Sequence, residues 1–203
     1  MSNTPRLIIA SNNPGKVREF RDLLGDTVQI VTMGDLGLDS PEETEDTFTG
    51  NAAIKARFLH RHTGEVTLAD DSGLVIDALS GRPGVWSARY AGEPPDDAAN
   101  RAQVLQEMGG VQPDERSARF IAAIVMIGTD GREHVVEGVC EGSIGFEERG
   151  TNGFGYDSIF TLPNGQTMAE LTSEEKGRIS HRGNALRQLL PVLRSELGLG
   201  TEP

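Results

Sequence analysis

The sequence has one cysteine, three lysines and no long hydrophobic run, and these shortages exclude several classes of protein. The single cysteine, Cys140, excludes an internal disulfide framework and a cluster of cysteine metal ligands. No apolar run is long enough to cross a bilayer, and the first residues lack the charged and apolar regions of a signal peptide. We therefore expect a cytoplasmic protein with no membrane partner.

Positive charge is also scarce. The chain carries 31 acidic and 19 basic residues, which gives a formal net charge of −12. A bulk field of that sign argues against nucleic acids and anionic membranes as partners. It is compatible with a phosphate ligand, because a few local cations together with Mg²⁺ can hold one. A chain of 203 residues can bury a sizeable core, and we expect a single domain over residues 1–203 with room for two lobes.

Only three of the 19 basic residues are lysines, namely Lys16, Lys55 and Lys176. A lysine ammonium is a compact point charge that suits a phosphate oxygen, whereas arginine presents a wide planar fork. The chain otherwise uses arginine, so the three lysines are candidates for positions where arginine would not serve. The alternative is that these three lysines are present by chance. That alternative is weakened because each lysine lies inside a motif described below.

Two adjacent carboxylates, Asp70 and Asp71, follow an apolar run and precede Ser72 and Gly73. Consecutive strand residues point to opposite faces, so both acids can face one ligand only if the strand ends between them. We expect a strand end that carries the acids into a cleft. There Mg²⁺ would take one or two carboxylates and complete its shell with water and phosphate oxygens. An ordinary solvated turn is the alternative, because Asp, Ser and Gly are common turn residues.

A polar loop connects the first predicted strand to the first predicted helix. In residues 6–10, four apolar side chains follow Arg6 and predict a buried strand, and helical spacing of apolar residues begins at Val17. The loop between them ends in Lys16, at a helix N-terminus whose free N–H groups and partial positive charge suit a phosphate. It is not a Walker A motif, because Val17 stands where that motif has a hydroxyl residue. A plain strand-to-helix turn is the alternative.

Apolar periodicity predicts the remaining elements. Strands are expected at residues 28–32, 74–79, 117–128 and 132–140, and helices at about 47–59, 98–108 and 181–197. Asp130-Gly131, between two of these strands, is a hairpin signal that adds antiparallel strands to strand–helix units. The fold class is therefore α/β with a mixed sheet. Pro191 removes a backbone hydrogen bond from the last helix, so we expect a kink or break near Arg187.

A glycine-interrupted aromatic loop covers residues 152–157. Glycines let the backbone approach a ligand. Phe154 or Tyr156 could stack on a flat base, and Asp157 could accept a hydrogen bond from a ring N–H. An aromatic residue that packs in the core is the alternative.

Basic residues gather around the start of the last predicted helix. His181 stands next to Arg182 and a few residues after Lys176. A histidine at a helix start usually caps or packs, but in this company it looks more like a binder of an anion or a carbonyl group.

Seven motifs, taken in order, resemble the inosine/xanthosine triphosphate pyrophosphatase family, whose members remove deaminated purine nucleotides. They are Ser11-Asn12-Asn13-x-x-Lys16, the segment from Glu42 to Ala56, and the strings ADDSGL, RPGVWSARYAG, GFGYD, LTSEEK and SHRGNAL. The resemblance implies Mg²⁺-dependent hydrolysis of ITP, dITP and XTP to the monophosphate and pyrophosphate. It also implies a long twisted mixed β-sheet flanked by helices, two lobes with a central active-site cleft, and a homodimer.

The resemblance also assigns roles to individual residues. Asp71 matches the catalytic acid and, together with Glu42, the metal ligands. The substrate-binding positions are Ser11, Asn12, Asn13, Gly15 and Lys16 for the triphosphate, Ser72, and Phe154, Gly155, Tyr156, Asp157, Lys176, His181 and Arg182 for the base. Lys55 is a weaker candidate for the charge beside the phosphates. The family often has glycine where Glu45 stands and glutamate where Gly50 stands, and the second departure removes an acid beside the metal site.

On this interpretation, water attacks the α-phosphorus, and Asp71 orients it or accepts its proton. A 6-keto oxygen accepts hydrogen bonds from donors such as His181 and Arg182, whereas an adenine amino group leaves those donors without a partner. Two alternatives stay open. One is a pyrophosphatase of the septum-inhibitor type that acts on other modified nucleoside triphosphates, although SHRG and GFGYD fit it poorly. The other is a non-catalytic nucleotide-binding sensor, against which the clustered acids speak.

Overall fold

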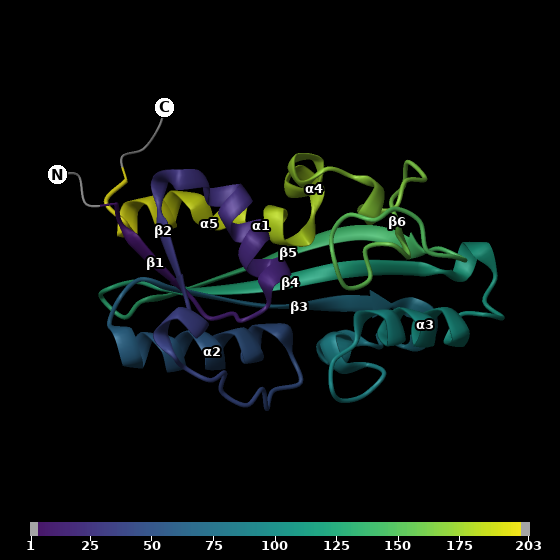
Figure 1. Cartoon of the computed structure of the whole chain (residues 1–203), viewed down its shortest axis with the longest axis horizontal. Coiled ribbons are helices and arrows are strands. Elements are labelled where there is room, and N and C mark those ends of the chain that lie inside the picture. Colours follow the sequence, from purple (N-terminus) through teal and green to yellow (C-terminus); the bar gives the residue numbers. More distant parts are fainter. Residues whose placement is uncertain (1–3, 200–203) are drawn as a thin grey trace. The chain divides into compact units, whose positions relative to one another are not determined.

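The computed structural model describes residues 4–199, and six strands form one sheet in the order β2-β1-β3-β4-β5-β6 (Figure 1). The strands are β1 Arg6–Ile9, β2 Gln29–Thr32, β3 Thr67–Ile76, β4 Ser117–Ile127, β5 Glu133–Ile144 and β6 Phe160–Thr161. The helices are α1 Pro14–Leu24, α2 Phe48–Thr63, α3 Asp97–Glu107, α4 Ser173–Ile179 and α5 His181–Glu196. β1 is parallel to β2 and β3, whereas β5 is antiparallel to β6. The predicted α/β class with a mixed sheet is confirmed.

Two compact units divide the chain. The first contains the described residues up to Asp71, Ala122–Gly138, and the described residues from Arg182 onward. The second contains Ser72–Ile121 and Val139–His181. The strands β3, β4 and β5 each contribute residues to both units.

Alternation along β1 divides the core of the first unit into two apolar clusters. Leu7 and Ile9 belong to one cluster, together with residues of α1 and α5, whereas Ile8 and Ala10 belong to the other, together with residues of α2. Successive strand side chains point to opposite faces, so a continuous apolar run serves both clusters. Figure 1 shows α1 and α5 on one side of these strands and α2 on the other.

The second unit has a core of its own, with one buried arginine at its edge. Arg116, directly before β4, is 2 % exposed. Its guanidinium donates to the carbonyl oxygens of Met108, Ile144 and Gly145, each at 2.7 Å. A guanidinium offers five N–H donors and no acceptor, so a single side chain ties the end of α3 to the end of β5.

Replacing Arg116 with methionine is expected to lower the free energy of unfolding by about 2 to 3 kcal/mol, because buried carbonyl groups lose a charged donor. Arg119→Met is the matched control. Arg119 pairs with Asp77, and these two side chains are 33 % and 46 % exposed, so their pair contributes at most about 1 kcal/mol. Equal losses for the two variants in urea unfolding would contradict the role given to Arg116.

The course of β3 corrects the strand end expected between the two adjacent acids. The strand continues from Thr67 to Ile76 without interruption, so Asp70 and Asp71 point to opposite faces. The reason is packing, because buried apolar residues before and after the acids hold the backbone extended. The strand also ends at Ile76, three residues earlier than expected, since Asp77–Leu79 forms a 3₁₀ turn.

The helix α5 is continuous from His181 to Glu196, so it does not break near Arg187, and a kink there stays a prediction. Pro191 lies inside the helix and removes one backbone hydrogen bond. The apolar stripe of α5 is buried in the same cluster as α1, and tertiary packing of such a stripe contributes more to helix stability than one backbone bond. Within residues 4–199, none of the helices has the length and apolar character needed to cross a membrane.

Candidate active site

Lys55 of α2 and Asp71 of β3 are the centre of a buried cluster in the first unit. The Lys55 ammonium donates to Asp71 Oδ1 at 2.9 Å, to the Asp70 carbonyl oxygen at 2.9 Å and to Glu43 Oε1 at 2.8 Å. All three of its hydrogens are thereby used. Burial alone would lower the pKa of Lys55, but the carboxylates of Asp71 and Glu43 outweigh it and hold that pKa above its ordinary value. Lys55 is therefore a fixed positive charge that orients Asp71.

The other carboxylate oxygen of Asp71 distinguishes this cluster from a purely structural ion pair. Oδ2 is buried and has no hydrogen-bond partner among residues 4–199. Leaving a buried polar atom without a partner costs about 1 to 3 kcal/mol, so a cation or a water molecule gains binding energy there. Burial raises the pKa of Asp71, while the Lys55 and Lys16 ammonium groups oppose the rise and Glu43 adds to it. A raised pKa brings a carboxylate closer to the range of a general base.

Asp70 faces the opposite side of β3 and pairs with two cations. Arg182 of α5 donates through Nε to Oδ1 at 3.2 Å and through Nη2 to Oδ2 at 3.1 Å, and Lys16 Nζ lies 2.7 Å from Oδ2. Arg182 also forms an ion pair with Glu19 of α1. Burial alone would raise the pKa of Asp70, but Arg182 and Lys16 outweigh it and hold that pKa well below its ordinary value. Asp70 is therefore ionised at neutral pH and fixes Lys16 in place.

The predicted phosphate loop leads from β1 into α1 as expected. Asn13 caps the helix, and its side-chain oxygen accepts hydrogen bonds from the N–H groups of Gly15 at 2.9 Å and Lys16 at 3.2 Å. Ser11 is buried and its hydroxyl accepts from the Asn13 N–H, whereas Asn12 is exposed. The loop thus gathers a lysine and a helix N-terminus, which are groups that bind phosphate.

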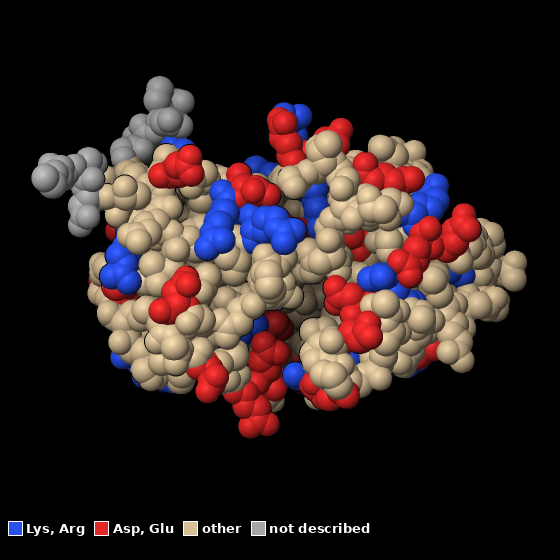
Figure 2. All heavy atoms as spheres, viewed as in Figure 1, with Lys and Arg blue, Asp and Glu red and all other residues tan. Residues whose placement is uncertain are grey.

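The acidic loop before α2 brings Glu43, the residue after the predicted metal ligand Glu42, to Lys55. Glu43 is half-buried and bonds Lys55, whereas Glu42 is exposed. Figure 2 shows acidic side chains protruding where Figure 1 draws this loop. Among the described residues, no group of three acidic, histidine or cysteine side chains is placed to hold a metal. The metal pair Glu42 and Asp71 therefore stays a prediction, and a cation at Asp71 would take most of its ligands from water and substrate.

The two departures from the family pattern lie against each other in the structure. A Cβ at Gly50 would lie 2.6 Å from the Glu45 Cβ and 2.9 Å from the Thr47 hydroxyl oxygen. The Glu45 N–H donates to Asn51 Oδ1 at 3.0 Å, which fixes the loop against the start of α2. Because real Cβ atoms do not approach so closely, Glu45 in this position requires glycine at position 50. The effect of this coupled change on metal binding stays a prediction.

In the second unit, Phe154 and Lys176 share one carboxylate. Asp157 Oδ2 accepts from the Phe154 N–H at 2.9 Å and from the Lys176 ammonium at 2.5 Å. Lys176 Nζ also lies 4.9 Å from the centre of the Phe154 ring, a cation–π distance. Gly153 has a φ of +80°, and a Cβ there would lie 2.0 Å from Asp157 Oδ2, so only glycine fits. The structure thus brings together three of the predicted base-binding residues.

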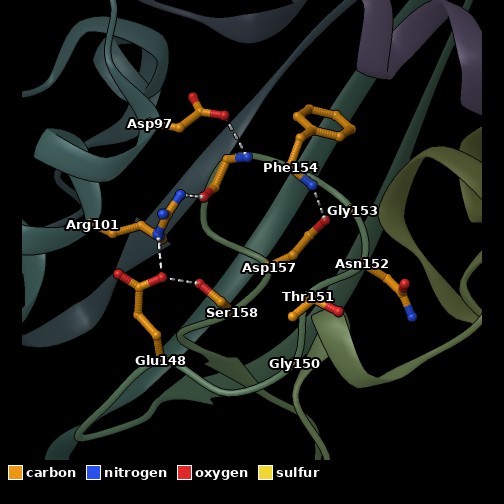
Figure 3. A pocket seen from close by; sticks show the side chains of 11 residues that line it. Asp97, Arg101, Glu148, Gly150, Thr151, Asn152, Gly153, Phe154, Asp157 and Ser158 are labelled. Carbon is orange, nitrogen blue, oxygen red and sulfur yellow. Dashed lines mark hydrogen bonds and ion pairs between the residues drawn. The ribbon is translucent and has the colours of Figure 1, made fainter.

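A pocket of about 310 Å³ opens beside this loop (Figure 3). It is lined by Asp97, Arg101, Glu148, Gly150, Thr151, Asn152, Gly153, Phe154, Gly155, Asp157 and Ser158. The first two belong to α3, and the others belong to the segment between β5 and β6. The aromatic loop therefore forms one wall of a concave site whose other wall is a helix.

Tyr156 is a core residue rather than a stacking platform. Its side chain is 5 % exposed, and its hydroxyl donates to the Ser87 carbonyl oxygen at 2.7 Å. Of the two predicted stacking aromatics, Phe154 is the half-buried one with ring surface to offer. Ser72, the residue after Asp71, is also half-buried, and its contact with substrate stays a prediction.

His181 and Arg182 are neighbours in sequence with different surroundings. The buried His181 ring stacks on Phe120 of the second unit, with ring centroids 4.9 Å apart. Arg182 is 1 % exposed and bonds Asp70 and Glu19 of the first unit. Its predicted contact with the base stays a prediction, whereas its contact with Asp70 is a role that the sequence did not suggest.

Sequence reasoning missed three further residues of these sites. Glu43 is one of several acids in a row, so its pairing with Lys55 has no local signal. Asp97 and Arg101 resemble ordinary charged residues of a surface helix. Their spacing of four puts them on one face of α3, which is the only sequence signal that could have marked them.

Comparison with known proteins gives a consistent result. The Ham1 family model matches residues 7–192. The chain is 47 % identical over 196 residues to the dITP/XTP pyrophosphatase of Haemophilus influenzae, which covers 95 % of this chain and 98 % of that one. The corresponding protein of Desulforamulus reducens is 49 % identical over 191 residues, or 93 % and 95 % of the two chains. Among solved structures, a HAM1 protein from Coxiella burnetii has a TM-score of 0.84 at 42 % identity and covers 94 % of this chain and 99 % of its own.

Proposed function

This chain belongs to the Ham1 family, and we propose that it hydrolyses deaminated purine nucleoside triphosphates, namely ITP, dITP and XTP, to the nucleoside monophosphate and pyrophosphate. The names of the two curated relatives support dITP and XTP as the substrate class. The charge distribution supports it too, because an acidic chain places the buried Lys55 and the half-buried Lys16 beside the acids of β3.

The main support for the proposal is that the two oxygens of the Asp71 carboxylate have different surroundings. Oδ1 is held by Lys55 at 2.9 Å, while Oδ2 is buried without a partner among the described residues. A fixed carboxylate with one open oxygen can orient a water molecule and accept its proton at Oδ2. Catalysis by positioned proton acceptors depends first on geometry and then on pKa, and both are favourable at Asp71.

We propose Mg²⁺ as the cation, held by Asp71 and by the acidic loop that contains Glu42 and Glu43. The donor set fits it, because these are hard oxygen ligands in small number, and Mg²⁺ usually takes one or two carboxylates along with water and phosphate oxygens. A carboxylate has about four lone-pair sites, so Asp71 can serve a cation and a water molecule together. When bound, Mg²⁺ neutralises charge on the phosphate oxygens and on the leaving pyrophosphate.

Lys16 and the loop before it are assigned to the triphosphate. Lys16 is held by Asp70 at 2.7 Å, so its charge is positioned before substrate arrives. Fixed charges of this kind stabilise a developing phosphate charge without reorganisation. Lys55 acts through Asp71, because all its donors are engaged.

The second unit is assigned to the base. Phe154 offers a ring face, and Lys176 and His181 carry donor groups that suit a 6-keto oxygen better than an adenine amino group. A site that leaves its buried polar groups without partners rejects the wrong base by orders of magnitude. The homodimer remains part of the same proposal, and Trp86, which is 57 % exposed, is a candidate contact because aromatic residues are enriched at interfaces.

Product analysis tests the function directly. The protein is incubated with ITP, XTP, GTP or ATP, with Mg²⁺ or with a chelator, and the products are separated. We expect monophosphate and pyrophosphate from ITP and XTP only with Mg²⁺, and a kcat/KM about 10²-fold lower for ATP. Diphosphate and phosphate would contradict the attack at the α-phosphorus. Binding of ITP without turnover would favour a sensor, and turnover of other modified nucleotides alone would favour the septum-inhibitor type.

A further inference from the structure

We propose that Asp97 and Arg101 of α3 are positioning residues that hold Gly155, and through it Phe154, in the conformation that selects the base. The inference rests on the proposed function, because it assigns a specificity role to residues outside the predicted site. Neither residue needs to touch the substrate. Both act through the backbone of the aromatic loop.

The two side chains form hydrogen bonds to both backbone polar groups of one glycine, its N–H and its carbonyl oxygen. Asp97 Oδ2 accepts a hydrogen bond from the Gly155 N–H at 2.8 Å, and Arg101 Nη1 donates to the Gly155 carbonyl oxygen at 2.9 Å. Figure 3 draws these two bonds as dashed lines that start from Asp97 and Arg101, both residues of α3. Residues four apart lie on one face of a helix, so α3 presents an acceptor and a donor at the spacing of one peptide unit.

The backbone conformation of Gly155 explains why these two hydrogen bonds matter. Its φ is +60°, a conformation that side chains other than glycine rarely adopt, and a Cβ there would meet nothing within 4 Å among the described residues. A side chain at this position would therefore point into open space, and the backbone angle is what favours glycine there. Glycine loses more conformational freedom on ordering than any other residue, and the two bonds from α3 offset part of that cost.

Together with a bond from Asp157, the two hydrogen bonds to Gly155 fix the backbone on both sides of the Phe154 side chain. Asp157 accepts from the Phe154 N–H at 2.9 Å, and Asp97 accepts from the N–H that follows. Arg101 is itself oriented, because its Nε donates to Glu148 at 2.8 Å. Glu148 in turn accepts from the Ser158 hydroxyl at 2.9 Å. The loop is thus tied to α3 at one end and to its own carboxylate at the other.

The chemical consequence concerns base selection more than phosphate chemistry. The Phe154 ring lies beside Lys176, and a loop ordered in advance lets the base meet ring and donor without a further ordering penalty. When the hydrogen bonds from Asp97 and Arg101 are lost, the loop adapts to several bases and binds each more weakly. The acids and lysines of the first unit are untouched by this change, so the chemical step is preserved.

Steady-state kinetics with ITP and ATP on the full chain tests the inference. Asp97→Ala and Arg101→Met are each expected to raise the KM for ITP about tenfold and to lower the ITP-to-ATP ratio of kcat/KM about tenfold. The kcat for ITP should stay within about twofold. Asp97→Asn retains an acceptor oxygen and should restore most of the ratio, which a requirement for negative charge alone would not predict.

Asp96→Ala is the matched control. Asp96 caps α3 by accepting from the N–H groups of Ala98 and Ala99, and its side chain serves the helix start rather than the aromatic loop. Its loss should lower the melting temperature and leave the ITP-to-ATP ratio unchanged. If Asp97→Ala does not fold, Arg101→Lys serves in its place, because lysine keeps the charge and loses the fork that reaches Gly155 and Glu148 together.

The failure of this inference is distinguishable from failure of the proposed function. If the unaltered chain hydrolyses ITP and both Asp97→Ala and Arg101→Met keep its ratio and KM, the positioning role is overturned while the function stands. A loss confined to kcat, or a loss of ratio in Asp96→Ala equal to that in Asp97→Ala, overturns it as well. An unaltered chain that turns over no purine triphosphate contradicts the function itself.

Discussion

Replacing Asp71 with asparagine is expected to lower the kcat for ITP by roughly 10³-fold while the chain stays folded. The amide oxygen of asparagine can still accept the bond from Lys55 that Asp71 Oδ1 now accepts at 2.9 Å. The change therefore removes the charge and the basic oxygen and keeps the shape. Steady-state rates at saturating ITP and Mg²⁺ measure the effect, and the melting temperature reports on folding.

Asp77→Asn is the matched control for Asp71→Asn. It makes the same chemical change in the turn that follows β3, where Asp77 is 46 % exposed and pairs with Arg119. This variant should keep its full kcat. An Asp71→Asn protein with normal rate and normal melting temperature would contradict the catalytic role of Asp71, and equal losses in both variants would point to a general effect of charge.

The parts of the fold that could be predicted are those that depend on local sequence patterns. The continuous apolar run of β1 predicts a strand buried on both faces, and Ile8 and Ile9 indeed belong to different clusters. The Asp130-Gly131 signal predicts the hairpin between β4 and β5, where the Gly128 N–H donates to the Arg132 carbonyl oxygen at 3.0 Å. The unbroken α5 could not be predicted, because the packing that holds Pro191 in a helix comes from residues far away in sequence.

The candidate site was predictable in its residue types and less so in its pairings. The rarity of lysine points to Lys16, Lys55 and Lys176, and each forms an ion pair with a buried aspartate. Which aspartate Lys16 and Lys55 each contact depends on the alternation of β3. A strand end between Asp70 and Asp71 would have brought both acids to one ligand, whereas the continuous strand gives the two acids separate partners.

The second large effect is expected for Asp70→Asn, which should lower the free energy of unfolding by about 3 to 5 kcal/mol. The Asp70 side chain is fully buried and faces Lys16 and Arg182. Breaking a buried ion pair by removing one partner leaves uncompensated charge in a poorly solvated place. Here the removal leaves two cations with Glu19 as the remaining acid of the cluster. Urea unfolding at neutral pH with a chelator present measures the loss.

A double-mutant cycle separates the ion pair from the loss of a side chain. Arg182→Met removes the fork that grips both Asp70 oxygens, and we expect Asp70→Asn and Arg182→Met together to lose less than the sum of the single losses, by about 2 kcal/mol. High salt should change this coupling little, because buried pairs are screened much less than surface pairs. Strict additivity would show that the two side chains stabilise the first unit independently.

The same carboxylate predicts a pH dependence of definite sign. Burial opposes ionisation of Asp70, but Arg182 and Lys16 outweigh it and hold its pKa in the folded chain well below the ordinary 3.8. The unfolded chain therefore binds this proton first as the pH falls, so the stability contributed by Asp70 is complete above about pH 5 and declines below about pH 4. The difference in unfolding free energy between the unaltered chain and Asp70→Asn should shrink as the pH falls from 5 to 3. A difference that stays constant over this range would mean that Asp70 is not the ionised partner of Lys16 and Arg182.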